Sequence, residues 1–188
     1  MARVISIIGS KGKLAHSLKD RLSINDDIVS YGRDQVDFND LTTINNIVPA
    51  LTKSDIIVVC SGALSDDVNE TMMINSLGPI YLINELIKAN CQAHVVVIGS
   101  HGATWTSWPG IDMSRLTYNI AKKCLCDFVV GLEQSDMTDM KLTVVNLSRF
   151  QSPLSNYTGV SVDQVVDNIS WIIDQPNPPL IFENGKEK

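Results

Sequence analysis

Tyr118 and Lys122 are the two residues whose types and spacing could support acid–base chemistry. They lie four positions apart, so on a helix their side chains would share one face. A neighbouring ammonium group favours the phenolate, so it would lower the pKa of the tyrosine and make Tyr118 an acid or base near neutral pH. The same spacing is also typical of a tyrosine packed beneath a lysine side chain. The elements that position the pair must decide between these interpretations.

The composition indicates a single globular domain that does not bind nucleic acid. The chain has 188 residues, 44% of them apolar and 19% charged, with a net charge of -6 that disfavours nucleic acid and anionic membranes as partners. No apolar run is long enough to span a membrane, and no secretory pattern precedes Val4. The four cysteines, Cys60, Cys91, Cys124 and Cys126, have no clustered ligands beside them. We therefore expect free thiols, no metal site and a cytoplasmic protein.

Short apolar runs alternate with segments of helical periodicity. The expected strands are 4–8, 27–31, 35–38, 55–60, 93–98, 142–147 and 180–182. The expected helices are 13–22, one that begins after Asn39-Asp40 and stops before Pro49, 66–90 with a break at Gly78-Pro79, one carrying Tyr118 as far as about 133, and 162–173. This alternation predicts an α/β Rossmann fold, a doubly wound parallel sheet with helices on both faces, in one domain over residues 1–188.

A glycine-containing turn lies where such a sheet binds ligands, beyond the carboxyl ends of its strands. The turn Gly9-Ser10-Lys11-Gly12-Lys13-Leu14 follows the first strand and opens the first helix, where free N–H groups attract phosphate. Gly9 would permit the tight turn, and Gly12 would let a phosphate approach the backbone. Arg33 follows the second strand, and a guanidinium there suits the 2′-phosphate of NADP. We expect NADP as the cofactor, with NAD as the alternative.

Taken in order, these segments resemble the short-chain dehydrogenase/reductase family over about residues 3–154. Val36-Asp37-Phe38 looks like the family segment whose Asp binds adenine. Cys60-Ser61-Gly62 stands at the family's N-A-G-like motif, with Cys60 in place of the Asn. The segment 147–152 occupies the place of the P-G-x-x-x-T loop, with Leu147-Ser148 replacing Pro-Gly. The resemblance implies that these segments, with Asp37, Phe38, Cys60, Ser61, Gly62, Phe150 and Ser152, bind the dinucleotide.

The same resemblance implies a catalytic set. Tyr118 and Lys122 fall in the family's Y-x-x-x-K, Ser100 follows the fifth expected strand, and Asn75 falls in the family's N-x-x-G. Tyr118 would then exchange a proton with the substrate oxygen, and Lys122 would lower its pKa and bind the nicotinamide ribose. Ser100 would hydrogen-bond the substrate oxygen, and Asn75 would hold a water beside Lys122. Ser100 precedes Tyr118 by 18 residues, more than in common members, so Ser107 and Ser114 are rivals for the hydroxyl role.

The function implied is reversible hydride transfer between a nicotinamide and a small carbonyl or alcohol substrate. A non-catalytic dinucleotide sensor of the same fold is one alternative, because the segment that would cover the substrate is short. A relative of the sugar-nucleotide epimerases or dehydratases is another. A hydrolase using Ser100 and His101 is disfavoured, because the G-x-S-x-G nucleophile elbow is missing. The resemblance also implies a homodimer or homotetramer, for which Met72, Met73, Ile80, Leu82 and Ile83 could serve as core or as interface.

Overall fold

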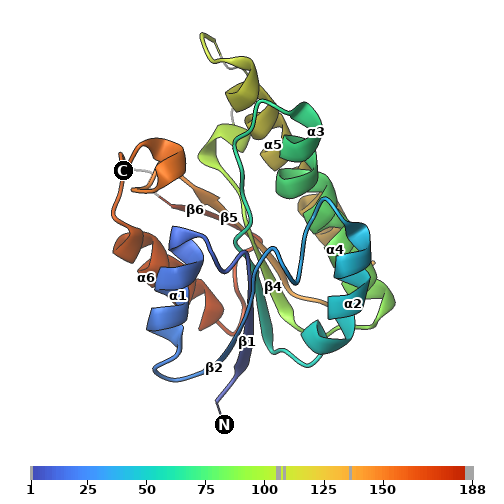
Figure 1. Ribbon diagram of the computed structural model, residues 1–188. Coiled ribbons are helices and arrows are strands. Elements are labelled where there is room, and N and C mark those ends of the chain that lie inside the picture. Colours follow the sequence, from blue (N-terminus) through green and yellow to red (C-terminus); the bar gives the residue numbers. More distant parts are fainter. Residues whose placement is uncertain (1, 105–106, 108, 136, 185–188) are drawn as a thin grey trace.

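A six-stranded sheet with helices on both faces forms the protein (Figure 1). The structure is a computed structural model that describes residues 2–104, 107, 109–135 and 137–184. The strands are β1 (Val4–Ile8), β2 (Asp27–Tyr31), β3 (Ile56–Val59), β4 (His94–Ile98), β5 (Leu142–Leu147) and β6 (Ile181–Asn184). The α-helices are α1 (Lys13–Leu22), α2 (Leu41–Leu51), α3 (Val68–Met72), α4 (Gly78–Lys88), α5 (Met113–Gln134) and α6 (Val162–Ile173). Shorter helical segments are the π-helix Met73–Leu77 and the 3₁₀ turns His101–Thr104 and Pro153–Ser155.

All neighbouring strands of the sheet are parallel, in the order β2-β1-β3-β4-β5-β6. The chain moves from β1 to β2 in one direction and from β3 to β6 in the other. The order therefore reverses between β1 and β3, and the carboxyl ends of these two strands open the crevice in which doubly wound sheets bind ligands. This confirms the predicted α/β Rossmann-type architecture.

Each central strand is buried on both faces, because its alternate side chains enter two separate cores. Ile57 and Val59 of β3 belong to the core beneath α2, α4 and α5. Ile56 and Val58 of the same strand belong to the core beneath α1 and α6. Figure 1 shows α1 and α6 together on one side of the sheet and α2, α4 and α5 on the other. The continuous apolar runs of the sequence thus became inner strands.

One expected strand and one expected helix end were wrong. Residues 35–38 form turns, closed by hydrogen bonds from the N–H groups of Gln35 and Val36 to the carbonyl of Gly32, and not a strand. Helix α2 continues through Pro49 to Leu51, whose side chain is fully buried. Burial of Leu51 in the core favours one further turn although Pro49 cannot donate a backbone hydrogen bond. The break expected at Gly78-Pro79 is the junction of the π-helix Met73–Leu77 with α4.

Among the described residues, no helix combines the length and the apolar character that crossing a bilayer requires. In the same part of the chain, no three His, Cys, Asp or Glu side chains gather into a group that could hold a metal ion. The four cysteines are free thiols, with Cys91 and Cys126 buried and Cys124 exposed.

Candidate active site

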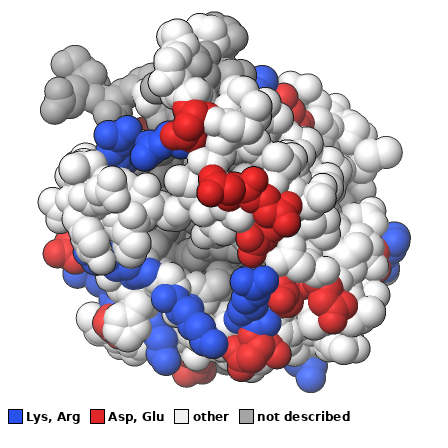
Figure 2. All heavy atoms as spheres, turned by 45° about the horizontal axis from the view of Figure 1, so that its top comes forward, with Lys and Arg blue, Asp and Glu red and all other residues white. Residues whose placement is uncertain are grey.

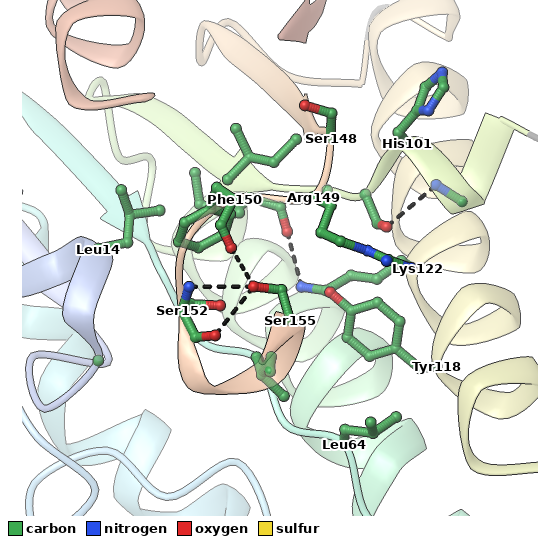
Figure 3. Close-up of a pocket in the computed structure, with 18 of the residues that line it drawn as sticks. Leu14, Leu64, His101, Tyr118, Lys122, Ser148, Arg149, Phe150, Ser152 and Ser155 are labelled. Atoms are coloured by element: carbon green, nitrogen blue, oxygen red, sulfur yellow. Dashed lines mark hydrogen bonds between the residues drawn. The ribbon is translucent and has the colours of Figure 1, made fainter. Parts of the chain in front are cut away.

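A cavity of about 540 Å³ opens at the carboxyl ends of the central strands. Its wall comes from the start of α1, from the segments that follow β3, β4 and β5, and from the first turns of α5. Figure 2 shows a hollow on this face of the molecule, bordered by Lys and Arg on one rim and by Asp and Glu on another. Figure 3 shows how residues far apart in the sequence converge on the cavity.

The turn between β1 and α1 has the geometry of an anion site. Gly9 has a φ of +88°, and a Cβ atom there would lie 3.1 Å from the backbone nitrogen of Ser61, so only glycine fits closely. Gly12 caps α1 without any side-chain hydrogen bond, which leaves the first amide groups of the helix free to bind a ligand. Lys11, Gly12, Lys13 and Leu14 line the cavity, whereas Gly9 and Ser10 support the turn through hydrogen bonds to the Tyr31 carbonyl.

Tyr118 and Ser100 line the same cavity from different elements. Tyr118 projects from α5 with its hydroxyl on the side where Lys122 lies (Figure 3). Burial raises the pKa of Tyr118 to about 12, and a hydrogen bond with the Ser100 side chain acts in the opposite direction. The expected lowering of the Tyr118 pKa is therefore wrong for this structure, because desolvation of the buried phenolate is the largest effect on that pKa. Ser100 Oγ also accepts a hydrogen bond of 3.2 Å from the Gly102 N–H.

Lys122 is a buried cation, only 2% exposed. Its Nζ donates to the carbonyl oxygens of Ile98 (2.8 Å) and Ser61 (3.2 Å), and it lies 6.0 Å from the centre of the Tyr118 ring. Burial lowers the pKa of Lys122 to about 8, although the nearby Cys126 and Cys60 act in the opposite direction. The ammonium thus ties the ends of β3 and β4 to α5 beneath the tyrosine.

Asn75 lies in the π-helix and is fully buried. Its Nδ2 donates to the carbonyls of Ala63 (2.7 Å) and Thr71 (2.8 Å), and its Oδ1 accepts from the Ala63 N–H (3.2 Å). Both amide hydrogens are therefore used on the backbone, and the side chain fastens the segment after β3 to the helix. Asn75 does not line the cavity directly.

Besides Gly9 and Ser10, three expected cofactor residues lie outside the cavity wall: Arg33, Asp37 and Phe38. Arg33 is exposed after β2, with Nε 3.1 Å from Asp37 Oδ2 and a second contact of 3.7 Å to Glu70. Asp37 also accepts a hydrogen bond from the Asn39 N–H, which with Arg33 keeps the pKa of its carboxyl below the ordinary value against the effect of burial. Phe38 is a core residue, 4% exposed, and packs against Gly78.

Other expected residues do face the cavity. Cys60, Ser61 and Gly62 line it after β3, and Phe150 and Ser152 line it after β5. Burial raises the pKa of the Cys60 thiol to about 12, so Cys60 is a neutral wall residue. The Ser155 hydroxyl donates to the carbonyls of Phe150 and Ser152, which fixes the turn that carries them (Figure 3).

Several lining residues were given no role of their own by the sequence patterns, although Ser148 and Arg149 lie in the segment 147–152 that was expected to bind the dinucleotide: His101, Arg115, Asn119, Ser148 and Arg149. Asn119 and Arg115 flank Tyr118 on the same helix, so helical spacing from Tyr118 could have indicated them. Of the rivals to Ser100, Ser114 donates to Asp112 at the start of α5, and neither it nor Ser107 is among the residues that line the cavity.

Comparison with known proteins finds similar solved structures, although no similar curated sequence. No protein-family model and no curated protein sequence matches the chain. A short-chain dehydrogenase from Burkholderia cenocepacia in complex with NADP is similar in structure, with a TM-score of 0.83 and 12% identity over 98% of this chain and 88% of that one. The 3-alpha-hydroxysteroid dehydrogenase from a Pseudomonas species, complexed with NADH, has a TM-score of 0.78 and 18% identity over 97% and 96% of the two chains.

A third similar structure is dTDP-4-dehydrorhamnose reductase from Bacillus anthracis in complex with NADP. Its TM-score is 0.75 and its identity 14%, over 100% of this chain and 76% of that one. At these identities the likeness concerns the arrangement of the backbone. The chain has the fold of the short-chain dehydrogenases/reductases.

Proposed function

We propose that this protein is an NAD(P)-dependent oxidoreductase that transfers a hydride between a nicotinamide and a small carbonyl or alcohol substrate. The observation that carries the proposal is that Ser100, Tyr118 and Lys122 line one cavity with the uncapped first turn of α1. In reduction, a carbonyl compound, the reduced nicotinamide and one proton give the alcohol and the oxidised nicotinamide. Atoms and charge balance without a further reactant.

The residues present fit a dinucleotide. The backbone of Lys11–Leu14 would hold its phosphates at the start of α1, with Lys11 and Lys13 adding positive charge. Cys60–Gly62, Phe150 and Ser152 would border the nicotinamide half of the cavity. Arg33 would bind a 2′-phosphate beyond the cavity, where Asp37 and Glu70 now contact it. NADP is the preferred cofactor and NAD the alternative. When bound, the nicotinamide supplies or accepts the hydride.

Side chains of the protein would supply the proton that the carbonyl oxygen receives in reduction. Tyr118 keeps its proton at neutral pH, because its pKa is about 12, and this suits an acid that donates to a carbonyl oxygen as that oxygen becomes an alcohol. The Ser100 hydroxyl would stabilise the same oxygen as negative charge develops on it. Lys122, whose pKa of about 8 lies near physiological pH, can return a proton toward Tyr118.

Titration of the purified protein with NADPH and NADH, followed by a panel of aldehydes and ketones, tests the proposal. We expect both nucleotides to bind, NADPH more tightly, and at least one carbonyl class to be reduced with consumption of NADPH. Failure to bind either nucleotide would overturn the proposal.

A non-catalytic dinucleotide sensor is the second candidate. The observation in its favour is the segment between β5 and α6, whose Tyr157 ring lies 5.2 Å from Nζ of Lys13 and so approaches the phosphate turn. Tight nucleotide binding without turnover of any carbonyl would select the sensor over the enzyme.

A further inference from the structure

The cavity carries positive charge in a protein that is negative overall. The chain has a net charge of -6. The described residues that line the cavity nevertheless include Lys11, Lys13, Arg115, Lys122 and Arg149, and no Asp or Glu. The acidic side chains on the rim in Figure 2 therefore stop short of the lining. A cavity of this composition attracts anions.

A dinucleotide would not use all of these cations. Lys11 and Lys13 lie at the phosphate turn, and Lys122 is committed to two backbone carbonyls. The two arginines lie on other elements, α5 and the segment after β5. Arg115 is 3.6 Å from the carboxylate of Asp112. Arg149 is exposed, and its guanidinium has no ion pair or hydrogen bond with any residue that the structure describes.

The Arg149 side chain extends across the cavity toward the side on which Tyr118 and Lys122 lie (Figure 3). Its backbone is pinned, because its carbonyl accepts a hydrogen bond of 3.1 Å from the Val160 N–H, and the Gln151 N–H donates to the Val160 carbonyl at 3.0 Å. Gly159 packs directly against this carbonyl with a φ of +103°, and a Cβ there would collide with it. A fixed backbone that carries an unpaired guanidinium is suited to hold a ligand group in one orientation.

We propose that Arg149 binds a carboxylate of the substrate, so that the substrate is a small oxo acid in reduction or a hydroxy acid in oxidation. This inference rests on the function proposed above. A guanidinium pairs with a carboxylate through two parallel hydrogen bonds, which would fix the distance from the carboxylate to the reacting carbon beside Tyr118. The cavity of about 540 Å³ must also admit the nicotinamide, which favours a short substrate.

Rates of NADPH consumption with linear 2-, 3- and 4-oxo acids and their methyl esters test the proposal. We expect kcat/KM for one acid to exceed that for its ester by about 100-fold, the size of a charge-assisted contact. Arg149→Gln should remove this preference by lowering kcat/KM for the acid while leaving the ester little changed. Arg149→Lys should restore part of the rate. Equal use of acid and ester by the wild-type protein would overturn the proposal.

Two further variants separate Arg149 from a general charge effect. Arg21 pairs with Asp167 on the outer helices and lies outside the cavity, so Arg21→Gln removes one positive charge and should leave the acid preference intact. If Arg115→Gln removes the preference and Arg149→Gln does not, the assignment to Arg149 is wrong. A weaker affinity of Arg149→Gln for NADPH itself, with the acid preference unchanged, would assign Arg149 to the cofactor and overturn the proposal.

Calorimetry of the NADPH-loaded protein measures ligand binding directly, so this test does not depend on turnover. The probes are succinate, its uncharged diamide and a short alkyl phosphate. Binding of succinate that Arg149→Gln abolishes would support the carboxylate site even if no carbonyl is reduced, in which case the oxidoreductase proposal alone fails. Binding of the alkyl phosphate in preference to succinate, or of the diamide as well as succinate, would overturn the choice of a carboxylate.

Discussion

Tyr118 is a strong candidate for the proton donor because its surroundings keep it neutral. Burial raises its pKa to about 12, so the hydroxyl is protonated over the whole range in which the protein would work. Phenylalanine keeps the ring and removes only the hydroxyl. We therefore expect Tyr118→Phe to lower kcat for carbonyl reduction by about 100- to 10,000-fold, the range of general acid catalysis, and to leave the Kd for NADPH nearly unchanged.

Steady-state rates and fluorescence titration of NADPH make this measurement. Thr117→Ser, on the neighbouring helical position outside the cavity lining, is a matched control that should keep full activity. If Tyr118→Phe retains wild-type turnover, a different group donates the proton, and the catalytic assignment is wrong.

Arg33 decides the expected choice between the two nucleotides. It is exposed beyond the phosphate turn, but Asp37 and Glu70 compete with any 2′-phosphate for its guanidinium. Arg33→Ala should weaken NADPH about 10-fold or more and NADH far less, since only NADPH carries the group that the guanidinium would bind. Glu70→Gln should tighten NADPH, because it frees Arg33 from one carboxylate. Equal losses for both nucleotides in Arg33→Ala would contradict the choice of NADP.

At the scale of elements, Gly78 lies at the junction between the π-helix and α4, where it packs against the core. A Cβ atom at Gly78 would lie 2.5 Å from Cβ of Phe38, an atom that cannot move without its backbone. Gly78→Ala should therefore destabilise the protein by about 1–3 kcal/mol through overpacking. Gly131 in α5 has no neighbour within 4 Å of its Cβ position, so Gly131→Ala should stabilise by about 0.5–1 kcal/mol.

Urea unfolding of the two variants compares the same chemical change at a crowded and at an open helical position. Similar stabilities for Gly78→Ala and Gly131→Ala would contradict the packing of Phe38 under the π-helix. The same packing explains why Phe38 belongs to the core. Of the two residues that were expected to contact adenine, Asp37 alone therefore remains a candidate.

Strands of the parallel sheet were the most predictable elements, including the partly exposed edge strand β2. Val4–Ile8, Asp27–Tyr31 and Leu142–Leu147 have the expected bounds, because short apolar runs between polar or glycine residues leave few alternatives. The strand expected at 35–38 was wrong because the connection from the preceding strand, β2, is too short. Only three residues separate it from Tyr31, and a parallel neighbour needs a crossover of about a dozen.

The residues of the candidate site could be predicted where they lie close together in one segment of the sequence. The turn before α1 and the pair on α5 are local patterns, and both line the cavity. Arg149 was expected only as part of the segment 147–152 and was not singled out, because its guanidinium is distinguished by having no partner among the described residues, which only the packed structure shows. The direction of the Tyr118 pKa shift was missed because helical spacing shows which residues are neighbours and does not show the desolvation that burial imposes on the phenolate.

At the scale of the whole molecule, the apolar residues that could have formed an interface fall into a buried group and a partly exposed group. Leu82 and Ile83 are fully buried in the core, whereas Met72, Met73 and Ile80 are partly exposed. Leu77 and Ile120, on neighbouring helices, are 46% and 44% exposed. A homodimer or homotetramer through this side of the molecule stays a prediction, and sedimentation of the purified protein measures it.

The end of the sheet opposite the cavity holds a group that couples stability to pH. His94 is buried between β4 and β5, and its Nε2 lies 2.9 Å from Thr143 Oγ1. The Thr143 hydroxyl donates to the Pro179 carbonyl, so it accepts from His94, whose Nε2 therefore carries a proton. Burial, and to a smaller extent Lys141, lowers the pKa of His94 from 6.5 to about 4.

Because the unfolded chain binds this proton more readily than the folded one, stability must fall as the pH drops from about 6.5 to about 4. The loss approaches about 3 kcal/mol for a shift of this size. His94→Gln keeps a donor for Thr143 and cannot titrate, so its unfolding free energy should change much less over this interval. Urea unfolding of both proteins at several pH values makes the comparison. The carboxyl of Asp26, whose pKa Arg3 holds below 3.8, loses most of its contribution below this window. An equal slope in the two proteins would show that His94 is not the group responsible.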